Sequence, residues 1–537
     1  MKKLLLLLAA LFAISAGGIC CSGSGDDPGE QEKPVDPPPS PDDGVDWSKI
    51  DPKATVRGVV TCAGAAVQGV VVTDGVNMTR TNKQGAYGLR TSSDKSKLVY
   101  LTVPSGYEVE STRGFIPRFY RRVTAPTSVE QVQRHDFTLK KVNNDRHIMI
   151  VSADMHIRNR AMIKTTSSAT PSICPPKGEL DSTTFRRTYL KTLRDYVKAL
   201  PAGVPVYGMN LGDMTQESHW TNANKATLAN FVNVCERGGM PIQTFHAIGN
   251  HDHDRNKYTD REATENYRNH FGPTYYAFDM GRTHYIVLDD IVYHGAKKYD
   301  EQIDSLQLAW AAEYARRLPA GSRVCVAMHA PAMKAWKGNQ VMESAARLMD
   351  AFAGHELHFI TGHTHVNSNY DIREGVVEHN VAQICGNLWY DPINKDGTPK
   401  GYQLFRECGG EFSWEYRSLG SPAVRQLRVW QPGQVEAFPG SVVAKIWNWD
   451  PCWTVVWYED GRYRGAMQRI QIIDPDYAAH LDSLKNAGRK LAKSQHPRIS
   501  DFYFKARPSA SAQTIEVVAT DRFGRRYSER ITLEKAQ

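Results

Sequence analysis

The sequence has no pair of cysteines with the spacing of a zinc site or of a redox motif. Of its nine cysteines, two are adjacent near the N-terminus, at Cys20 and Cys21. The others are odd in number, and no two of them form a Cys-x-x-Cys pair. The sequence therefore predicts neither a thiolate metal site nor any particular disulfide bond. Cys235 and Cys325 lie in apolar stretches and are expected to be buried.

Long apolar runs and blocks of like charge are also missing beyond the N-terminal segment. No later stretch is apolar over the length that a lipid bilayer requires. The formal net charge is +8 and is spread along the chain. A dispersed basic surface suits an anionic substrate. A nuclease needs a continuous basic groove with stacking aromatic residues, so we expect no nucleic-acid partner. The oligomeric state is left open.

The N-terminus has the pattern of a bacterial lipoprotein signal peptide. Two lysines precede an apolar run over residues 4–14, which is too short for a membrane span. Small residues then lead to Cys20 and Cys21, although the usual leucine three positions before the cysteine is absent. We expect lipidation at Cys21, or else at Cys20, with ordinary secretory cleavage as the alternative. The protein would then be exported and attached to the bacterial cell envelope only through its lipid anchor.

Residues 22–46 contain mainly Gly, Ser, Pro and acidic residues and predict a flexible tether. Short alternating runs separated by Gly and Asn turns follow over residues 54–141 and predict a β-sandwich. Their glycine pattern, including Gly58, Gly69 and Gly85, resembles carboxypeptidase-regulatory-like or transthyretin-like domains. This domain carries no candidate chemistry and is expected to be a spacer.

The pattern changes between residues 146 and 370, where expected strands alternate with expected helices. The strands are predicted at residues 147–152, 204–211, 242–248, 284–289, 323–328 and 357–361. The helices are predicted at residues 182–200, 222–237 and 305–318. The chain is therefore expected to be a multidomain α/β protein. After Pro422 it returns to β-strands with one short helix, which predicts a second sandwich-like module.

Polar side chains follow five of the expected strands. They are Asp154 and His156, Asp213, the run Asn250-His251-Asp252, His329, and His363 with His365. Open α/β sheets place their sites at the carboxyl ends of strands. Carboxylate, amide and imidazole ligands suit divalent Mn, Fe, Zn or Co. Without His251 and Asp252, seven candidate ligands remain, which are too many for one tetrahedral ion. They fit two ions that share one carboxylate, for which Asp213 is the natural bridge.

The order Asp-x-His, Gly-Asp, Gly-Asn-His-Asp, His-x-Pro and Gly-His-x-His resembles the calcineurin-like metallophosphoesterase family. The resemblance implies a central β-sandwich core flanked by helices. It implies one ion on Asp154, His156, Asp213 and His365, and another on Asp213, Asn250, His329 and His363. It also implies that a metal-bridging hydroxide is the nucleophile. His251 would act as general acid or transition-state stabiliser, oriented by Asp252. The family's second histidine before the proline is replaced by Ala330, which leaves the ligand His329 in place.

The C-terminal region resembles the module that accompanies some bacterial members of this family, through Trp447, Trp449, Trp453 and the run 521–524. Its expected role is structural support. The expected domains are the signal peptide 1–21, the tether 22–50, the N-terminal β-sandwich 51–141, the phosphoesterase domain 142–420 and the C-terminal β module 421–537.

Further polar and aromatic residues near the strand ends are candidates for substrate contacts. They are His219, Trp220, Tyr275, Asn387, Asp391 and Tyr402. The alternative is that these side chains pack the seam between domains. The leading hypothesis is metal-dependent hydrolysis of a phosphomonoester or phosphodiester. The alternatives are a non-catalytic ligand-binding lipoprotein and an exported nuclease or nucleotidase.

Overall fold

The computed structural model describes residues 44–91, 97–124, 127–162, 174–217, 227–295, 298–386, 389 and 391–533. Cys20, Cys21, His219, Trp220 and Asn387 lie outside these residues. Within them, no helix combines the length and the apolar character needed to cross a lipid bilayer.

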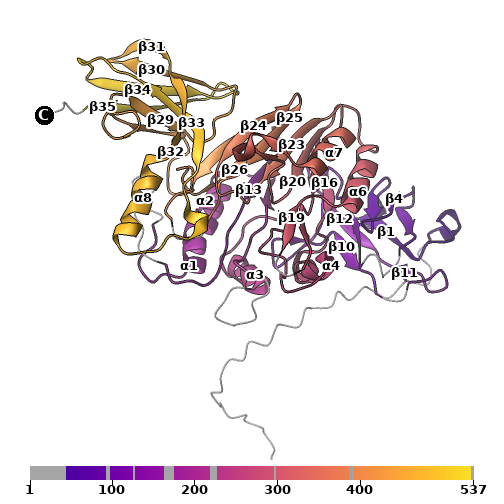
Figure 1. Cartoon of the computed structure of the whole chain (residues 1–537). Coiled ribbons are helices and arrows are strands. Elements are labelled where there is room, and N and C mark those ends of the chain that lie inside the picture. The colour runs from indigo at the N-terminus through magenta and orange to yellow at the C-terminus, as the bar shows by residue number, and fades with distance from the viewer. Residues whose placement is uncertain are drawn as a thin grey trace, which may run out of the picture. The chain divides into compact units, whose positions relative to one another are not determined.

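The N-terminal region forms two main β-sheets, as predicted, and a two-stranded sheet of β8 (Ser111–Thr112) and β9 (Ile116–Pro117) (Figure 1). One sheet has the order β11-β1-β12-β7, with β2 and β5 also paired to β1, and the other has the order β10-β6-β3-β4. The bounds are β1 (Val56–Cys62), β2 (Ala65–Ala66), β3 (Val71–Thr73), β4 (Met78–Arg80), β5 (Ala86–Leu89), β6 (Leu98–Leu101), β7 (Tyr107–Glu108), β10 (Tyr120–Arg122), β11 (Gln133–Arg134) and β12 (Phe137–Lys141).

The central region contains two larger mixed sheets. The first has the order β15-β14-β13-β26-β27, with bounds β13 (Arg146–Ser152), β14 (Val206–Asn210), β15 (Thr244–His246), β26 (Gly401–Cys408) and β27 (Glu411–Ser418). The second has the order β16-β17-β20-β23-β25-β24, with bounds β16 (Tyr276–Met280), β17 (Thr283–Val287), β20 (Arg323–Ala327), β23 (Glu356–Thr361), β24 (Ser368–Arg373) and β25 (Val376–Asn380). Strands β13, β14 and β15 are parallel, as are β17, β20, β23 and β25.

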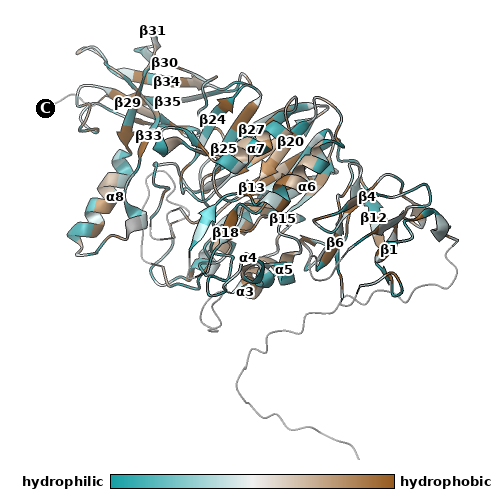
Figure 2. Ribbon diagram, turned by 45° about the vertical axis from the view of Figure 1, so that its right-hand side comes forward, coloured by the Kyte–Doolittle hydropathy of each residue, from teal (hydrophilic) through white to brown (hydrophobic). Residues whose placement is uncertain are grey.

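The two central sheets pack face to face because alternate residues of their strands point to opposite sides. In β13, Met149 and Val151 lie in the core between the sheets, and Ile148 and Ile150 lie on the outer face. Helices cover both outer faces. They are α1 (Asp181–Phe185), α2 (Lys191–Ala199), α3 (Leu228–Arg237) and α5 (Glu265–Phe271) on the first sheet, and α6 (Ser305–Ala315) and α7 (Glu343–Ala351) on the second. The central strands are mainly brown in Figure 2, as expected for strands covered on both faces. The predicted sandwich flanked by helices is confirmed.

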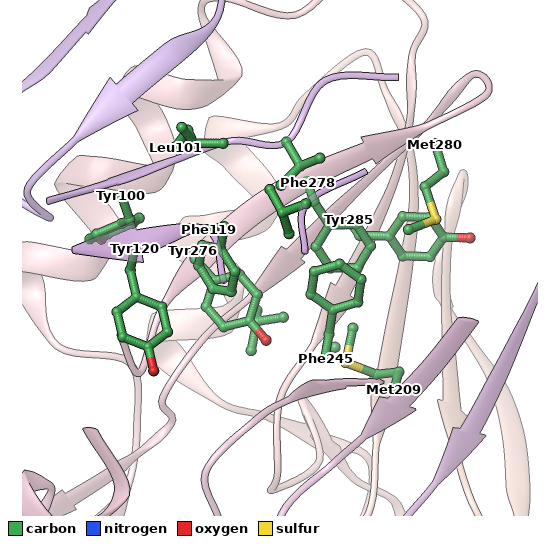
Figure 3. Close-up of a cluster of buried hydrophobic side chains, with 14 of the residues drawn as sticks. Tyr100, Leu101, Phe119, Tyr120, Met209, Phe245, Tyr276, Phe278, Met280 and Tyr285 are labelled. Carbon is green, nitrogen blue, oxygen red and sulfur yellow. The ribbon is translucent and has the colours of Figure 1, made fainter. Parts of the chain in front are cut away.

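The N-terminal sheets share a hydrophobic core with the central domain. The Phe119 ring lies 4.6 Å from the Tyr276 ring and 6.3 Å from that of Phe245, measured between centroids. Phe245 in turn stacks on Phe278 at 3.7 Å. Figure 3 shows these aromatic side chains converging from both parts of the chain. The N-terminal domain therefore buries part of the surface of the central sandwich.

The C-terminal region adds two sheets with the orders β28-β29-β33-β32 and β31-β30-β34-β35. The bounds are β28 (Leu427–Trp430), β29 (Val442–Ile446), β30 (Thr454–Glu459), β31 (Arg462–Ala466), β32 (Gln468–Ile473), α8 (Pro475–Asn486), β33 (Ile499–Ala506), β34 (Thr514–Thr520) and β35 (Arg526–Thr532). The buried Lys445 ammonium pairs with Asp396 at 2.8 Å, and Asn369 donates a hydrogen bond to Asn448 at 3.0 Å. Buried polar contacts thus join this module to the central domain.

The elements differ from the sequence prediction in several places, and helix α5 and strands β16, β24 and β25 are among those that were not predicted. The helix expected over residues 182–200 contains a π-helical turn, η3 (Arg186–Leu190), between α1 and α2. Helix α7 was not predicted. The hairpin β26–β27 was not predicted either, and β26 pairs antiparallel with β13 so that Gln403 lies opposite Val151. This pairing joins segments that are far apart in the sequence, which local patterns cannot reveal.

Candidate active site

The predicted metal ligands lie together at one edge of the two central sheets. Each follows a strand at its carboxyl end: Asp154 and His156 after β13, Asp213 after β14, Asn250 after β15, His329 after β20, and His363 with His365 after β23. Since the strands within each set are parallel, their carboxyl ends meet at the same edge. The side chains form three overlapping groups of donor atoms, and each group is compact enough for one ion.

One group consists of Asp154, His156 and His365. Asp154 Oδ1 lies 3.6 Å from His156 Nε2 and 3.5 Å from His365 Nε2. Donor atoms that share one ion at bond lengths of about 2.0–2.2 Å are roughly 3.0–3.5 Å apart. These separations therefore fit a shared divalent ion.

A second group consists of Asp213, His329 and His363, with Asn250 beside them. His329 Nε2 lies 3.0 Å from Asn250 Oδ1 and 3.1 Å from His363 Nδ1. It also lies 3.4 Å from Asp213 Oδ2. These are the four residues that the family resemblance assigns to the second metal ion.

Asp213 stands between the two groups. Its Oδ2 lies 3.4 Å from His329 Nε2 and 3.5 Å from His156 Nε2. One carboxylate oxygen is therefore within reach of ions on both sides, which is the geometry of a bridging ligand. His156, Asp213 and His251 form the third group of donor atoms.

The donor atoms fit metal ions better than they fit hydrogen bonds to protein. Asp154 Oδ1 and both ring nitrogens of His156 are buried and have no hydrogen-bond partner in the described part of the chain. A buried polar atom without a partner costs about 1–3 kcal/mol. Two ions held by these residues would satisfy such atoms. Burial alone would raise the Asp154 pKa, but His156, His365 and His329 together lower it to about 2.

Outer contacts orient the histidine ligands. His365 Nδ1 lies 2.8 Å from the Gly386 carbonyl oxygen, and His329 Nδ1 lies 2.8 Å from that of Leu211. Donation from Nδ1 to these carbonyls fixes the tautomer and leaves Nε2 free to bind metal. The backbone N–H of His363 donates to Asp154 Oδ2 at 2.9 Å, which links the two groups.

The backbone around the site is strained. Five candidate ligands have positive φ: Asp154 (53°), His156 (44°), Asp213 (54°), His363 (66°) and His365 (57°). For residues other than glycine this conformation costs roughly 1–2 kcal/mol each. Such strain persists where the surrounding structure imposes it, commonly at functional sites.

Two glycines of the sequence motifs are required by close approach. A Cβ atom at Gly249 would lie 2.3 Å from Asp213 Oδ1, and one at Gly362 would lie 2.8 Å from Asp154 Oδ2. Any larger residue would displace a carboxylate ligand. The glycines that precede Asn250 and His363 in the sequence are therefore part of the site's construction.

His251 lies at the edge of the site, and its side chain is partly exposed. Its backbone N–H donates to Asp213 Oδ1 at 2.8 Å, and its Nδ1 lies 2.5 Å from the Gln216 carbonyl oxygen. Donation from Nδ1 to this carbonyl leaves Nε2 available to a substrate. The imidazole is thus oriented by Gln216, whereas the sequence prediction gave that role to Asp252.

The Asp252 side chain has different partners from the one predicted, His251. Its buried carboxylate accepts hydrogen bonds from the backbone N–H groups of Asp213 (2.7 Å), Gly249 (2.9 Å) and Met214 (3.0 Å). It therefore fixes the backbone that carries the bridging ligand. We assign it as a positioning residue rather than a catalytic one.

A pocket with a volume of about 260 Å³ opens above the ligands. Besides the predicted residues, its walls include Trp336, Thr364, Lys395, Ser494 and Arg498. The sequence analysis missed these residues. Lys395 directly precedes the polar stretch 396–402 after the last motif, which is its only sequence signal. Arg498 comes from the C-terminal module and has no such signal.

Three predicted substrate contacts lie elsewhere. The Tyr275 hydroxyl donates to the carbonyl of Gly75 in the N-terminal domain. Asp391 is fully buried, and its carboxylate lies 2.6 Å from His480 Nε2 and accepts from the Tyr477 hydroxyl. Tyr402 is buried in the core beneath the helices. None of the three lines the pocket, and their contacts agree with the alternative that they pack between domains or in the core.

A mixed sandwich with two adjoining groups of histidine and carboxylate side chains at its edge has the arrangement expected of a dinuclear metal hydrolase. Three sequence models of one family match the chain. Residues 149–367 match calcineurin-like phosphoesterase, residues 54–142 match its N-terminal part, and residues 378–527 match its C-terminal part. The chain belongs to the calcineurin-like phosphoesterase family and is a phosphoric ester hydrolase.

Solved structures show similarity at low identity. A dimetal phosphatase from Danio rerio is 12% identical with a TM-score of 0.35, covering 51% of this chain and 96% of that chain. A 5′-nucleotidase from Candida albicans is 12% identical with a TM-score of 0.33, covering 52% of each. PhoD is 11% identical with a TM-score of 0.32, covering 87% of this chain and 85% of that one. The comparison with curated proteins gives no match.

Proposed function

We propose that this phosphoesterase hydrolyses phosphomonoesters at the bacterial cell envelope. The observation that supports a monoester is the charge of the pocket, where Lys395 and Arg498 join the metal ligands. A phosphomonoester is a dianion near neutral pH, whereas a phosphodiester carries one charge. Two cationic side chains beyond the metal site match the additional charge.

The ligand residues would hold two divalent ions, one on Asp154, His156 and His365 and one on Asn250, His329 and His363, with Asp213 shared. When bound, such ions supply Lewis-acid activation of the phosphoryl group and of the attacking hydroxide.

The chain's own residues position the substrate and handle the proton. Lys395 and Arg498, which line the pocket, bind the phosphate oxygens. His251 Nε2 donates a proton to the leaving oxygen, or stabilises charge on the phosphate, while Gln216 holds its Nδ1. General acid catalysis of this kind contributes typically 10²–10⁴-fold.

The envelope location rests on the N-terminal sequence. The lipoprotein-like signal and the tether predict an anchored enzyme, lipidated at Cys21 or Cys20. Incorporation of labelled palmitate into the wild-type chain, but not into a Cys20→Ala/Cys21→Ala variant, is the expected result. A labelled double variant would refute this anchor, and the single variants decide between the two cysteines.

The test of the activity is a panel of phosphomonoesters and phosphodiesters, assayed with purified protein whose bound metal has been quantified. We expect about two divalent ions per chain and a higher kcat/KM for monoesters. Lys395→Met should lower kcat/KM for monoesters more than for diesters, whereas Lys490→Met, at an exposed position, serves as the matched control. Hydrolysis confined to diesters would refute the monoester proposal.

A further inference from the structure

A larger cavity adjoins the metal pocket. Its volume is about 720 Å³, within the range of about 300–1,000 Å³ that is usual for small-molecule sites. It shares Trp336, Thr364 and Arg498 with the pocket above the metal ligands. A molecule whose phosphate sits on the metal ligands can therefore extend into this cavity.

The C-terminal module supplies two polar atoms to the cavity that lack partners. Arg498 Nη1 and Ser500 Oγ are both buried and have no hydrogen-bond partner within the described residues. Both residues line the cavity, and they lie two positions apart, Arg498 directly before β33 and Ser500 within it. Buried polar groups in proteins are nearly always hydrogen-bonded, so an unpaired pair in one cavity points to a polar ligand.

Aromatic rings form other walls of the same cavity. The Tyr370 ring lies 5.6 Å from the Phe502 ring, measured between centroids, and the Arg498 guanidinium lies 4.4 Å from the centroid of the Trp336 ring. These residues come from the central domain and from the C-terminal module. Ring faces bury the C–H surface of a ligand, whereas hydroxyl and guanidinium groups bind its oxygens.

Resting on the proposed function, we propose that this cavity binds the leaving group of the substrate, and that this group is a hydroxyl-rich sugar ring. Ser500 Oγ and Arg498 Nη1 bind its hydroxyl groups, and the aromatic walls pack on its faces. Arg498 stands between the two spaces and contacts both the phosphate and the sugar. The C-terminal module thereby sets the enzyme's choice of substrate. The ring can belong to a sugar phosphate or to the ribose of a nucleotide.

The test compares kcat/KM for three monoesters: a hexose phosphate, a nucleoside monophosphate and glycerol phosphate, whose leaving group is acyclic. We expect one of the ring substrates to exceed glycerol phosphate by at least about tenfold. Ser500→Ala removes one hydrogen bond and should lower that preference about 3- to 10-fold, mainly through KM. Trp336→Ala should also lower the preference for the ring substrate over glycerol phosphate. Ser511→Ala changes an exposed serine of the same module and should leave the preference as it is.

A binding measurement separates this inference from the proposed activity. Titration of the full chain with free hexose or free nucleoside, followed by tryptophan fluorescence, requires no hydrolysis. Binding of either one that weakens in Ser500→Ala supports the cavity's role, and the better ligand identifies the source of the ring. If monoesters are cleaved without preference for rings, and neither free compound binds, the inference is overturned while the activity stands. If no monoester is cleaved, the binding result decides the inference alone.

Discussion

The Asp252 carboxylate accepts a hydrogen bond of 2.7 Å from the backbone N–H of Asp213. Asp213 has a φ of 54°, and its side chain is the candidate bridge between the two metal groups. The carboxylate next to His251 in the sequence thus holds the backbone of the candidate bridging ligand. Its role is to maintain a strained turn.

Replacement of this carboxylate by an amide should weaken metal binding. In the wild type, backbone N–H groups donate to both carboxylate oxygens of Asp252. In Asp252→Asn, an NH₂ group replaces one of these oxygens, so at least one backbone N–H loses its acceptor. We expect a loss of roughly 1–3 kcal/mol in stability and about 10- to 100-fold in metal affinity. Metal titration and denaturant unfolding measure both. Asp482→Asn at an exposed position is the control, and wild-type metal affinity in Asp252→Asn would contradict the assignment.

The candidate ligands could be chosen from the sequence because each lies within a few residues of a strand end. The apolar run of β20, for example, ends directly before Met328 and His329, so the position of His329 follows from the strand alone. The structure explains the glycines of two motifs, since Gly249 and Gly362 lie too close to carboxylates to carry a side chain.

Residues contributed by the C-terminal module could not be predicted. Arg498 reaches the pocket because β33 and the segment before it pack beside the central domain, and no local pattern encodes that packing. The same holds for β26, which pairs with β13 across a long stretch of sequence. Tyr275 and Asp391 lie close to motifs in the sequence, but their hydroxyl and carboxylate groups bond to other parts of the chain.

Removal of metal should destabilise the central domain. An ion that binds the folded ligand set and not the unfolded chain would add about 3 kcal/mol for each site at a free concentration of 100 Kd. We expect chelation to lower the midpoint of thermal unfolding and Mn²⁺ or Zn²⁺ to restore it. Asp213→Asn should lack this response, because the group shared by both sites is gone. A full response in that variant would show that Asp213 is no bridge.

Stability should also depend on pH through His253, which lies outside the ligand set. Burial alone lowers the pKa of His253, but Asp289, at 3.5 Å, and Asp260 raise it to about 9. The folded pKa is above the unfolded value of about 6.5, so the stabilisation is complete below pH 6.5 and is lost as pH rises through 9.

We expect the stability difference between wild type and His253→Gln to decrease by about 3 kcal/mol between pH 6.5 and 9.5. Denaturant unfolding of both proteins across this range measures it. His294→Gln, which changes an exposed histidine paired with Asp300, is the control. A pH-independent difference for His253→Gln would mean that the imidazole is neutral in the folded protein.

His251 provides the sharpest test of the mechanism, because its proposed role depends on the leaving group. If His251 Nε2 protonates the leaving oxygen, His251→Ala should lower kcat by about 10²–10⁴-fold for alkyl phosphates, whose alkoxide leaves poorly. The loss should be much smaller for p-nitrophenyl phosphate, whose leaving group needs no proton. Bound metal should stay at the wild-type level, since Asp213 and the six other candidate metal ligands remain in this variant. Equal losses for both substrates would assign His251 to stabilisation of the phosphate instead, and loss of metal would make it a ligand.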